Sequence, residues 1–332
     1  MLYPVAVALA VGSSLGAVRG IDSTLAGSSP PIRVDDVDSG PGAEKLSGDG
    51  TVALVQASVK AARQGEPIPG ELRPALADLQ DDTADMGRCE NEEPPWQACL
   101  RGDRDGERTL VVLGDSHGRH WIPAFEEIAL DAGWSAYYLV KPQCSAARVR
   151  GVLNGEDRPS ADCQDFNAWA QRQVERLSPD LVVVSTTGAS RVWLDGTVVS
   201  DDAQVRRELR RGFAQLFDDL APLADRVSLL VDVPGRTSRP PQCLSARNAS
   251  LERCLDAPTA RRAATSRLSA EEARRAGVDV VPTEQWLCAD GACPAVVGDM
   301  VVQRDTGHLT TVYARHLADA LGRRLGGLRQ GR

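Results

Sequence analysis

Ser116 lies in the stretch GDSHG at residues 114–118, directly after the apolar run TLVVLG at residues 109–114. Three kinds of chemistry use this combination of carboxylate, hydroxyl and imidazole. A serine after the first strand of a domain can act as a nucleophile, a G-x-S-x-G turn can form a nucleophile elbow, and an Asp-x-His pair can bind metal. Other residues of the sequence distinguish these alternatives.

The metal alternative starts from Asp115 and His117, whose spacing resembles the opening motif of calcineurin-like metallophosphoesterases. Such a two-metal site needs several more His, Asp and Asn ligands downstream. The chain has four histidines in all, and neither GDxxD nor GNHE follows residue 118. We therefore expect no metal in this site.

The elbow alternative depends on where the serine falls in the sheet. In α/β-hydrolases the elbow follows a strand deep in the sheet, and the acid and the histidine come from separate later loops. Ser116 instead follows the first predicted strand of its domain. This position argues against an elbow.

The nucleophile alternative needs an acid and a histidine, and RDTGHLTT at residues 304–311 supplies Asp305 and His308. The Asp can accept a hydrogen bond from one ring nitrogen and so fix the tautomer, while the other nitrogen takes the proton of Ser116. Alone, this Asp and His fit a helix cap and an exposed histidine equally well. Together with GDSH they favour the Ser–His–Asp arrangement of SGNH hydrolases.

Apolar, β-branched runs alternate with amphipathic segments through the main part of the chain, which predicts a parallel sheet with helices on both faces. The predicted strands cover 109–114, 134–140, 180–186, 226–233 and 278–282. The predicted helices cover 119–132, 163–177, 203–222, 259–276 and 308–326. In such sheets functional groups gather at the carboxyl ends of the strands, which is where Ser116 falls.

The N-terminal third of the chain divides into three parts ahead of this domain. Residues 1–19 carry no charge before Arg19 and predict a membrane helix, the last span of a longer protein, with an export signal as the alternative. Residues 20–50 are rich in Gly, Ser, Pro and Asp and predict a flexible linker.

A small helical extension is predicted next, over residues 51–105. Residues 51–63 and 71–80 have helical spacing of apolar side chains and predict two short helices. The catalytic domain then occupies residues 106–328.

Cysteine usage indicates the cellular compartment, and the net charge bears on the class of partner. The eight cysteines favour an oxidising compartment, with reduced thiols as the alternative. Sequence-local pairing, one of many connectivities, joins Cys89 to Cys99, Cys144 to Cys163, Cys243 to Cys254 and Cys288 to Cys293. The net charge of −8 argues against a nucleic-acid partner.

Several motifs together resemble the extracytoplasmic SGNH domain of bacterial membrane acyltransferase-3 proteins, which O-acetylate cell-wall and surface glycans. The matching stretches include TLVVLGDSHGRHWIPAFEEIA, LVKPQC, VDVPGRTSRPPQC, TEQWLCADGACPAVVGD and RDTGHLTTVYARHLADAL. The resemblance implies a three-layer α/β/α, flavodoxin-like SGNH fold. It also implies Ser116 as nucleophile, His308 as base and Asp305 as its orienting partner.

The implied function is transfer of an acyl group, expected to be acetyl, to a glycan acceptor outside the cytoplasm. A donor such as acetyl-CoA would supply the group through a membrane acyltransferase-3 domain in cis, so we expect no cofactor in this domain and a location at the cell membrane. The alternatives are a secreted or membrane-anchored carbohydrate acetylesterase and a catalytically weak glycan-binding module.

The sequence departs from the family pattern at the oxyanion hole, because the third strand ends in STTGASRVW without the expected Asn. Loss of one such donor lowers the rate by about 10²- to 10³-fold. The Ser116 N–H is the first candidate donor. Further oxyanion or substrate candidates are Gly188, Ser145, His117 and Arg191.

Overall fold

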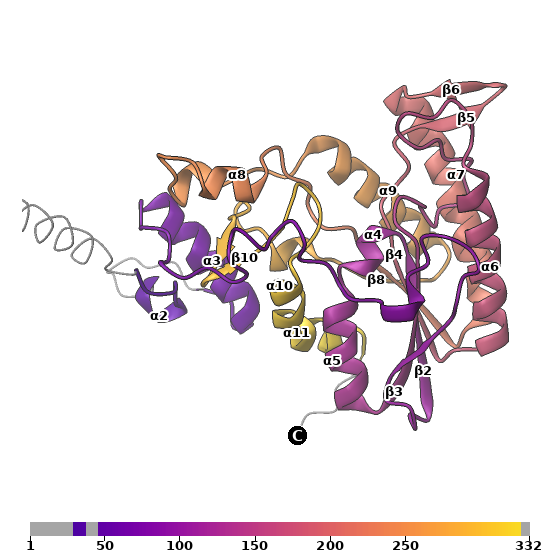
Figure 1. The fold of residues 1–332 in the computed structure, drawn as a ribbon, viewed down its shortest axis with the longest axis horizontal. Helices are drawn as coiled ribbons and strands as arrows, with labels where there is room; N and C mark the ends of the chain where they lie inside the picture. The colour runs from indigo at the N-terminus through magenta and orange to yellow at the C-terminus, as the bar shows by residue number, and fades with distance from the viewer. Residues whose placement is uncertain (1–28, 38–45, 327–332) are drawn as a thin grey trace, which may run out of the picture.

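Five buried, β-branched segments form the parallel core of a six-stranded sheet in a computed structural model, which describes residues 29–37 and 46–326 (Figure 1). The sheet order is β1-β3-β2-β4-β7-β8, with only β1 antiparallel to its neighbour. The strands are β1 (Leu100–Gly102), β2 (Arg108–Gly114), β3 (Trp134–Val140), β4 (Leu181–Ser185), β7 (Arg226–Leu230) and β8 (Asp279–Val281). The five predicted strands and the fold class are confirmed.

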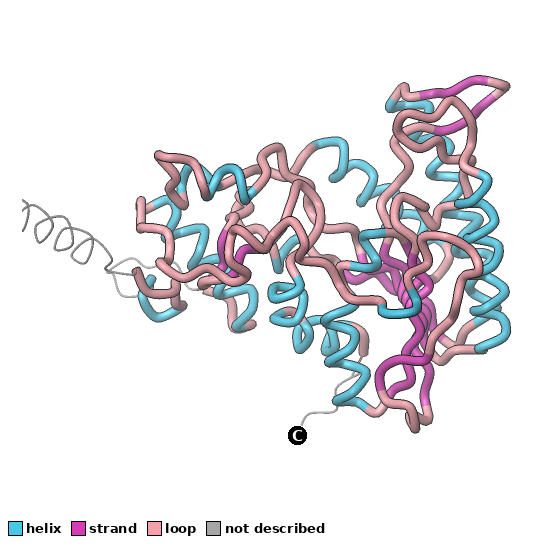
Figure 2. Tube along the Cα trace, in the orientation of Figure 1, coloured by secondary structure: helices cyan, strands magenta, loops and turns pink. Residues whose placement is uncertain are grey.

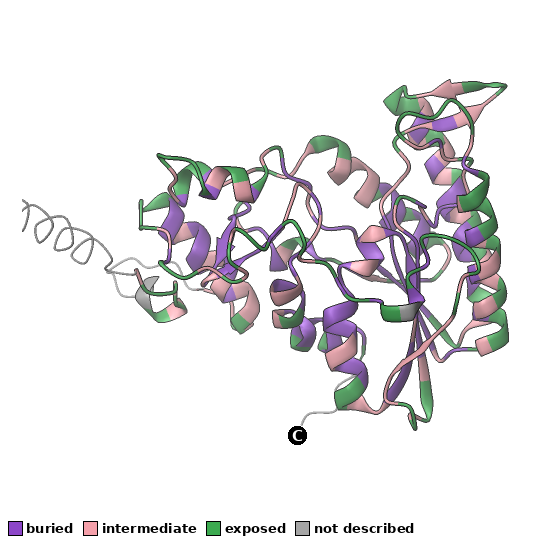
Figure 3. Ribbon diagram, in the orientation of Figure 1, coloured by how far each residue is buried: buried purple, intermediate pink, exposed green. Residues whose placement is uncertain are grey.

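Alternate residues of the central strand β2 point to opposite faces, and each face is covered by helices (Figures 1 and 3). Leu110 and Val112 pack against one layer, and Val111 and Leu113 against the other. The first layer holds α4 (Ser116–Arg119), α5 (Ile122–Ala132), α10 (Thr311–His316) and α11 (Ala318–Arg324). The second holds α6 (Ala161–Leu177), α7 (Asp202–Leu220) and α9 (Ala260–Arg275).

A small lobe lies beside these layers, and Figure 2 shows that loops make up much of it. It has its own buried cluster, which includes Leu79, Leu244, Val296 and Val301. The lobe contains α2 (Val34–Val37), α3 (Gly50–Arg63), α8 (Pro240–Leu244) and the hairpin of β9 (Val296–Val297) and β10 (Met300–Val301). A second hairpin, β5 (Val192–Leu194) with β6 (Thr197–Val199), projects from the opposite end (Figure 1).

The extension differs from its prediction in two ways. The helix predicted over 71–80 is wrong, because Arg73 pairs through its backbone with Asp299 and Val301, and Pro74 has no N–H to continue a helix. Residues 100–102, placed in the extension by the sequence, form β1 of the main sheet. The extension is therefore only partly helical and continues into the catalytic domain.

The predicted linker is partly ordered structure. Within the described residues 29–37, Ile32 donates a backbone hydrogen bond to Gly298 and packs on the small lobe. Apolar Ile32 and the short helix α2 explain why this part packs despite its polar composition. The predicted membrane helix at residues 1–19 lies outside the described residues. Among those described, no helix has both the length and the apolarity needed to cross a bilayer.

All four predicted disulfides are present, joining Cys89 to Cys99, Cys144 to Cys163, Cys243 to Cys254 and Cys288 to Cys293. Each closes a short loop, with sequence separations of 10, 19, 11 and 5 residues. The cysteine pairing inferred from sequence proximity is confirmed.

Candidate active site

The turn after β2 places Ser116 at the first residue of α4. Asp115 caps this helix and accepts hydrogen bonds from the His117 N–H at 2.8 Å, the Thr186 hydroxyl at 2.7 Å and the Thr187 N–H at 3.0 Å. Burial raises the pKa of Asp115. Gly114 is needed because a Cβ there would collide with the Ser185 carbonyl oxygen. The carboxylate thus holds the turn against the end of β4.

Ser116, His308 and Asp305 form one hydrogen-bonded chain across 192 residues of sequence. His308 Nε2 lies 2.9 Å from Ser116 Oγ, and His308 Nδ1 lies 2.7 Å from Asp305 Oδ2. The other oxygen, Asp305 Oδ1, accepts the backbone N–H groups of Gly307 and His308, both at 2.8 Å. The geometry is that of a hydroxyl, a base and an orienting acid.

The charge state of Asp305 follows from these contacts. Burial alone would raise its pKa, but the hydrogen bonds and charge interaction with His308, together with the backbone donors, lower it well below its usual range. The carboxylate is therefore ionised at neutral pH. An ionised acceptor at Nδ1 leaves His308 Nε2 free to accept the Ser116 proton.

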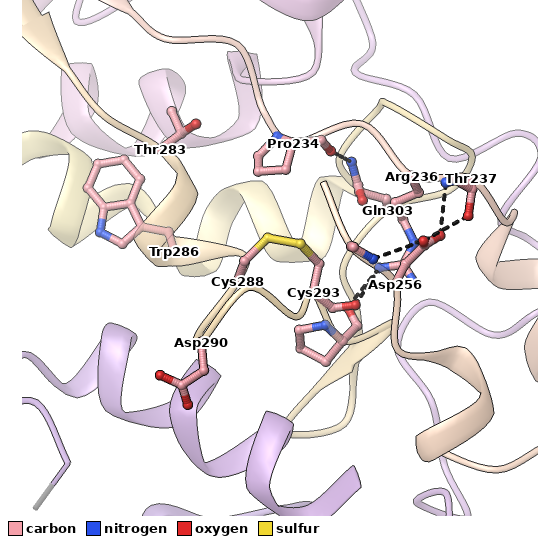
Figure 4. The surroundings of a disulfide bond; sticks show 12 residues. Pro234, Arg236, Thr237, Asp256, Thr283, Trp286, Cys288, Asp290, Cys293 and Gln303 are labelled. Carbon is pink, nitrogen blue, oxygen red and sulfur yellow. Dashed lines mark hydrogen bonds and ion pairs between the residues drawn. A yellow bond between two sulfur atoms is a disulfide. The ribbon is translucent and has the colours of Figure 1, made fainter. Parts of the chain in front are cut away.

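Figure 4 shows Gln303, two residues before Asp305, beside the loop of Arg236, where its side-chain amide donates to the Pro234 carbonyl at 3.1 Å. The buried Arg236 side chain donates to three backbone carbonyls, those of Cys254, Cys293 and Pro294, at 2.7, 2.9 and 3.2 Å. Its backbone N–H donates to Thr306, next to Asp305. Burial lowers the pKa of Arg236 to about 10, which still leaves it charged at neutral pH. The loop with Arg236 thus fixes the segment that carries Asp305 and His308.

Two residues that the sequence analysis missed, Asp232 and Arg262, hold His117. His117 Nδ1 lies 2.6 Å from Asp232 Oδ1, and Arg262 Nη1 lies 3.0 Å from Asp232 Oδ2. Burial opposes ionisation of Asp232, but the charges of His117 and Arg262 lower its pKa. Asp232 lies just after the carboxyl end of a parallel strand, where functional groups gather, so the sequence could have indicated it as a site residue. Arg262 lies at a helix start and carried no such signal.

His120 completes a cluster of three histidines. Its ring lies 5.2 Å from the His117 ring and 6.0 Å from the His308 ring, and it is buried. Neither ring nitrogen of His120 has a hydrogen-bond partner in the described part of the chain. Burial, reinforced by the neighbouring histidines, lowers its pKa well below 6.5, so the ring is neutral and packs behind the base.

A cavity of about 310 Å³ opens beside Ser116. Half of its lining residues carry hydroxyl or amide side chains, and the wall also holds one carboxylate, Asp115, and one cation, Arg262. The polar side chains of the wall include Gln143, Ser145, Asn154, Ser160, Gln164, Asn167 and Ser190. Such a wall can make many neutral hydrogen bonds to a polyhydroxylated ligand.

The predicted oxyanion and substrate candidates separate into two groups. Gly188 and Ser145 line the cavity together with Ser116. Arg191 does not line it, because its guanidinium donates to the carbonyls of Leu153 and Glu156 at 2.8 Å each and anchors that loop. The prediction of Arg191 as a substrate residue is therefore not supported. His117 contacts Asp232 and the His308 ring and is absent from the cavity wall.

Three backbone N–H groups at the cavity have no hydrogen-bond acceptor within the described residues: those of Ser116, Ser145 and Gly188. The Ser145 hydroxyl donates to the Thr187 carbonyl at 2.6 Å, and Asn167 Nδ2 donates to the Ser145 carbonyl at 2.9 Å. These bonds tie the Ser145 loop to the Gly188 loop and to α6. The arrangement can offer several donors to one oxygen atom.

The chain is similar to known proteins in sequence and in fold. The family model described as "SGNH domain (fused to AT3 domains)" matches residues 85–323. A similar solved structure is the periplasmic domain of a lipopolysaccharide acetyltransferase from Salmonella ser. Paratyphi A, with 13% identity, a TM-score of 0.50 and coverage of 67% of this chain and 85% of that one. Another is a carbohydrate acetylesterase from Sinorhizobium meliloti, with 14% identity, a TM-score of 0.41 and coverage of 67% and 100%. No curated protein sequence matches the chain.

Proposed function

This chain belongs to the family of SGNH domains that are fused to AT3 domains and is an enzyme of the SGNH type, and from this premise we propose that it transfers an acetyl group to a hydroxyl of a glycan outside the cytoplasm. One observation carries the proposal. The hydrogen-bonded chain of Ser116, His308 and Asp305 ends at a cavity whose wall is rich in hydroxyl and amide groups.

The first half-reaction forms an acyl-enzyme. Ser116 Oγ attacks the acyl carbonyl while His308 Nε2 takes its proton, and the collapse of the tetrahedral intermediate passes that proton to the departing donor. In the second half-reaction a glycan hydroxyl gives its proton to His308 and attacks the acyl carbon. His308 then returns the proton to Ser116 Oγ as the bond from this oxygen to the acyl carbon breaks. Asp305 stays ionised and holds the imidazole throughout. The N–H groups of Ser116, Ser145 and Gly188 are the proposed donors to the oxyanion.

The partner and the setting are parts of the same proposal. The family is described as fused to AT3 domains, so a membrane AT3 portion in cis would deliver the acyl group from a donor such as acetyl-CoA. Four disulfides in one chain favour an oxidising compartment. These features support a domain at the cell membrane that faces outward.

Carbohydrate acetylesterase activity is the second candidate function, because water can replace the glycan hydroxyl in the same two half-reactions. The intact Ser116–His308–Asp305 chain favours either of these over a binding module without activity. The two functions differ in the group that takes the acyl group from Ser116, which is a glycan hydroxyl in the transferase and water in the esterase.

The test measures p-nitrophenyl acetate hydrolysis and transfer together. We expect the wild type to hydrolyse this ester, Ser116→Ala to lose that activity and Ser245→Ala, an exposed serine in the small lobe, to keep it. Glycan oligomers that accelerate p-nitrophenol release and become acetylated would establish transfer. Faster release without acetylated glycan would favour the esterase, and equal activity of the Ser116→Ala and wild-type proteins would refute both.

A further inference from the structure

A strip of arginines leads away from the cavity beside Ser116, along the seam between α7 and α9. These two helices pack against each other on the same face of the sheet (Figure 1). We propose that this strip, defined here as the arginine groove, binds an acidic glycan chain and directs one of its hydroxyls to Ser116. This inference rests on the proposed function and adds the class of acceptor.

The arginine groove adjoins the cavity. A hollow of about 200 Å³ shares the wall of residues 187–190 and Arg262 with the cavity. A further hollow of about 300 Å³ shares Arg206 with the first hollow and extends along the helix seam. The three hollows therefore lie one after another, and a chain molecule bound along the seam would have one end beside the cavity of Ser116.

The lining of the two hollows is strongly cationic. Six arginines line them, against two acidic residues, Asp202 and Glu271. The six arginines are Arg206, Arg207, Arg210, Arg261, Arg262 and Arg267. This concentration of positive charge lies on a chain whose net charge is −8, so it marks a local attraction for anions.

Half of these arginines are paired inside the protein. Arg261 lies 3.2 Å from Asp202, Arg262 lies 3.0 Å from Asp232, and Arg210 lies 3.1 Å from Glu271 and 2.7 Å from Glu272. These pairs use the acidic residues of the hollows. The charge of these three arginines is therefore balanced within the protein.

The other three, Arg206, Arg207 and Arg267, have no carboxylate within ion-pair distance in the described part of the chain. Arg207 and Arg267 are exposed, and Arg206 is half-buried. Guanidinium groups bind planar carboxylates through two parallel hydrogen bonds. The groove therefore presents unneutralised guanidinium forks next to a cavity suited to sugar hydroxyls.

An acidic glycan fits both halves of this surface. Its hydroxyls match the hydroxyl and amide wall beside Ser116, and its carboxylates match the free guanidinium groups. The hollows between these groups are floored by small side chains such as Ala203, Ala264 and Thr265. A flat anionic membrane would meet the arginines as well, but it would not enter the cavity that adjoins the groove.

The test uses oligogalacturonate as the acidic probe and malto-oligosaccharide of equal length as the neutral probe. We expect the whole protein to bind the acidic probe more tightly, with an affinity that falls as salt rises. Arg207→Glu together with Arg267→Glu should weaken that binding at least about tenfold. The matched control, Arg172→Glu with Arg176→Glu, makes the same charge change on exposed residues of α6 and should leave binding nearly unchanged.

Hydrolysis of p-nitrophenyl acetate by each variant reports whether the protein is folded and whether the site works. Unchanged hydrolysis with lost binding supports the groove. Equal binding of the acidic and neutral probes, or equal weakening by the control pair, overturns it. Binding to phosphatidylglycerol vesicles that exceeds binding to the glycan and depends on Arg207 and Arg267 also overturns it, in favour of a membrane. The Ser116→Ala assay tests the proposed chemistry, and the binding assays test the groove. Either proposal can therefore fail without the other.

Discussion

Asp305 shows how much of the proposed chemistry depends on one hydrogen bond. Its Oδ2 accepts from His308 Nδ1 at 2.7 Å, and its Oδ1 is occupied by two backbone donors. The carboxylate therefore cannot move away from the imidazole without losing three hydrogen bonds. It sets which ring nitrogen carries the proton.

Replacing this acid with its amide tests the tautomer directly. In Asp305→Asn the side-chain amide can donate to Nδ1, which would place the proton on Nε2 and remove the base from Ser116. We expect kcat for p-nitrophenyl acetate to fall by about 10³- to 10⁴-fold. As a control, Asp299→Asn changes an acid paired with Arg73 in the small lobe and should retain kcat. A loss below about tenfold in Asp305→Asn would mean that Asp305 does not set the tautomer.

His120 makes stability depend on pH. Burial lowers its pKa well below 6.5 in the folded protein, whereas the unfolded chain binds the proton near 6.5. Its contribution is therefore complete above that pH and is lost as the pH falls, by about 1.4 kcal/mol per pH unit until the folded pKa is reached.

His120→Leu should remove this part of the pH dependence, because neither ring nitrogen of His120 has a partner to lose. Urea unfolding at about pH 7.5 and about pH 5.5 measures the change in the free energy of unfolding. We expect a smaller acid destabilisation in the variant than in the wild type. His316, whose pKa burial also lowers, is retained in both proteins and cancels in the comparison. Parallel losses in the two proteins would contradict the assignment.

Among the elements, the disulfide between Cys144 and Cys163 has the clearest link to the site. It joins the loop of Ser145 to α6, which carries Asn167, and both residues line the cavity. The bond from Asn167 to the Ser145 carbonyl runs beside it. The crosslink therefore fixes two walls of the cavity relative to each other.

Removing this crosslink should affect both stability and catalysis. For Cys144→Ser with Cys163→Ser we expect a loss of about 3 kcal/mol in the free energy of unfolding and a lower kcat/KM for p-nitrophenyl acetate. Cys89→Ser with Cys99→Ser is the control, since that pair closes a loop that does not line the cavity. It should lose stability but keep kcat/KM. Equal effects of the two pairs on kcat/KM would show that the disulfide does not shape the cavity.

The elements that the sequence predicted well share one property, a strong local pattern. The buried strands are continuous apolar runs, and GDSH and D-x-x-H stand at a strand end and before a helix. The small lobe lacks such patterns. Its pairing of Arg73 with Asp299 and Val301 joins residues more than 200 positions apart and leaves no local pattern. Pro74 was the local signal against a helix over residues 71–80.

The same limit applies to the site. Ser116, His308 and Asp305 carry motifs and were predicted, whereas Arg262 approaches His117 across 145 residues. Its position requires Gly235 and Gly307, where a Cβ would approach the guanidinium group within 2.7 and 2.9 Å. This contact joins residues far apart in the sequence and depends on two glycines, so no local sequence pattern predicts it.

At the scale of the whole molecule, the small lobe and the sheet form one body through α3. Val55 on this helix is fully buried in the main core, whereas Ala62 belongs to the cluster of the lobe. The Ser58 hydroxyl on the same helix accepts the Gly298 N–H at 3.2 Å. The segment predicted as an extension therefore packs into the main core as well as into the lobe.

Val55→Ala tests this unity. We expect a loss of about 2 kcal/mol in the free energy of unfolding, because a buried side chain loses two methyl groups. Unfolding followed by far-UV circular dichroism and by hydrolysis of p-nitrophenyl acetate should show one shared midpoint, shifted equally in the variant. Activity that survives a first transition of the circular dichroism signal would show that the lobe folds separately.

The central claim is that Ser116 carries the acyl group. Intact-mass and peptide mass spectrometry of protein quenched in acid during turnover of p-nitrophenyl acetate tests it most directly. The account predicts one added acetyl group on the peptide that contains Ser116, absent in Ser116→Ala and present in Ser245→Ala. Acetyl on another residue during turnover, or full activity in Ser116→Ala, would contradict it.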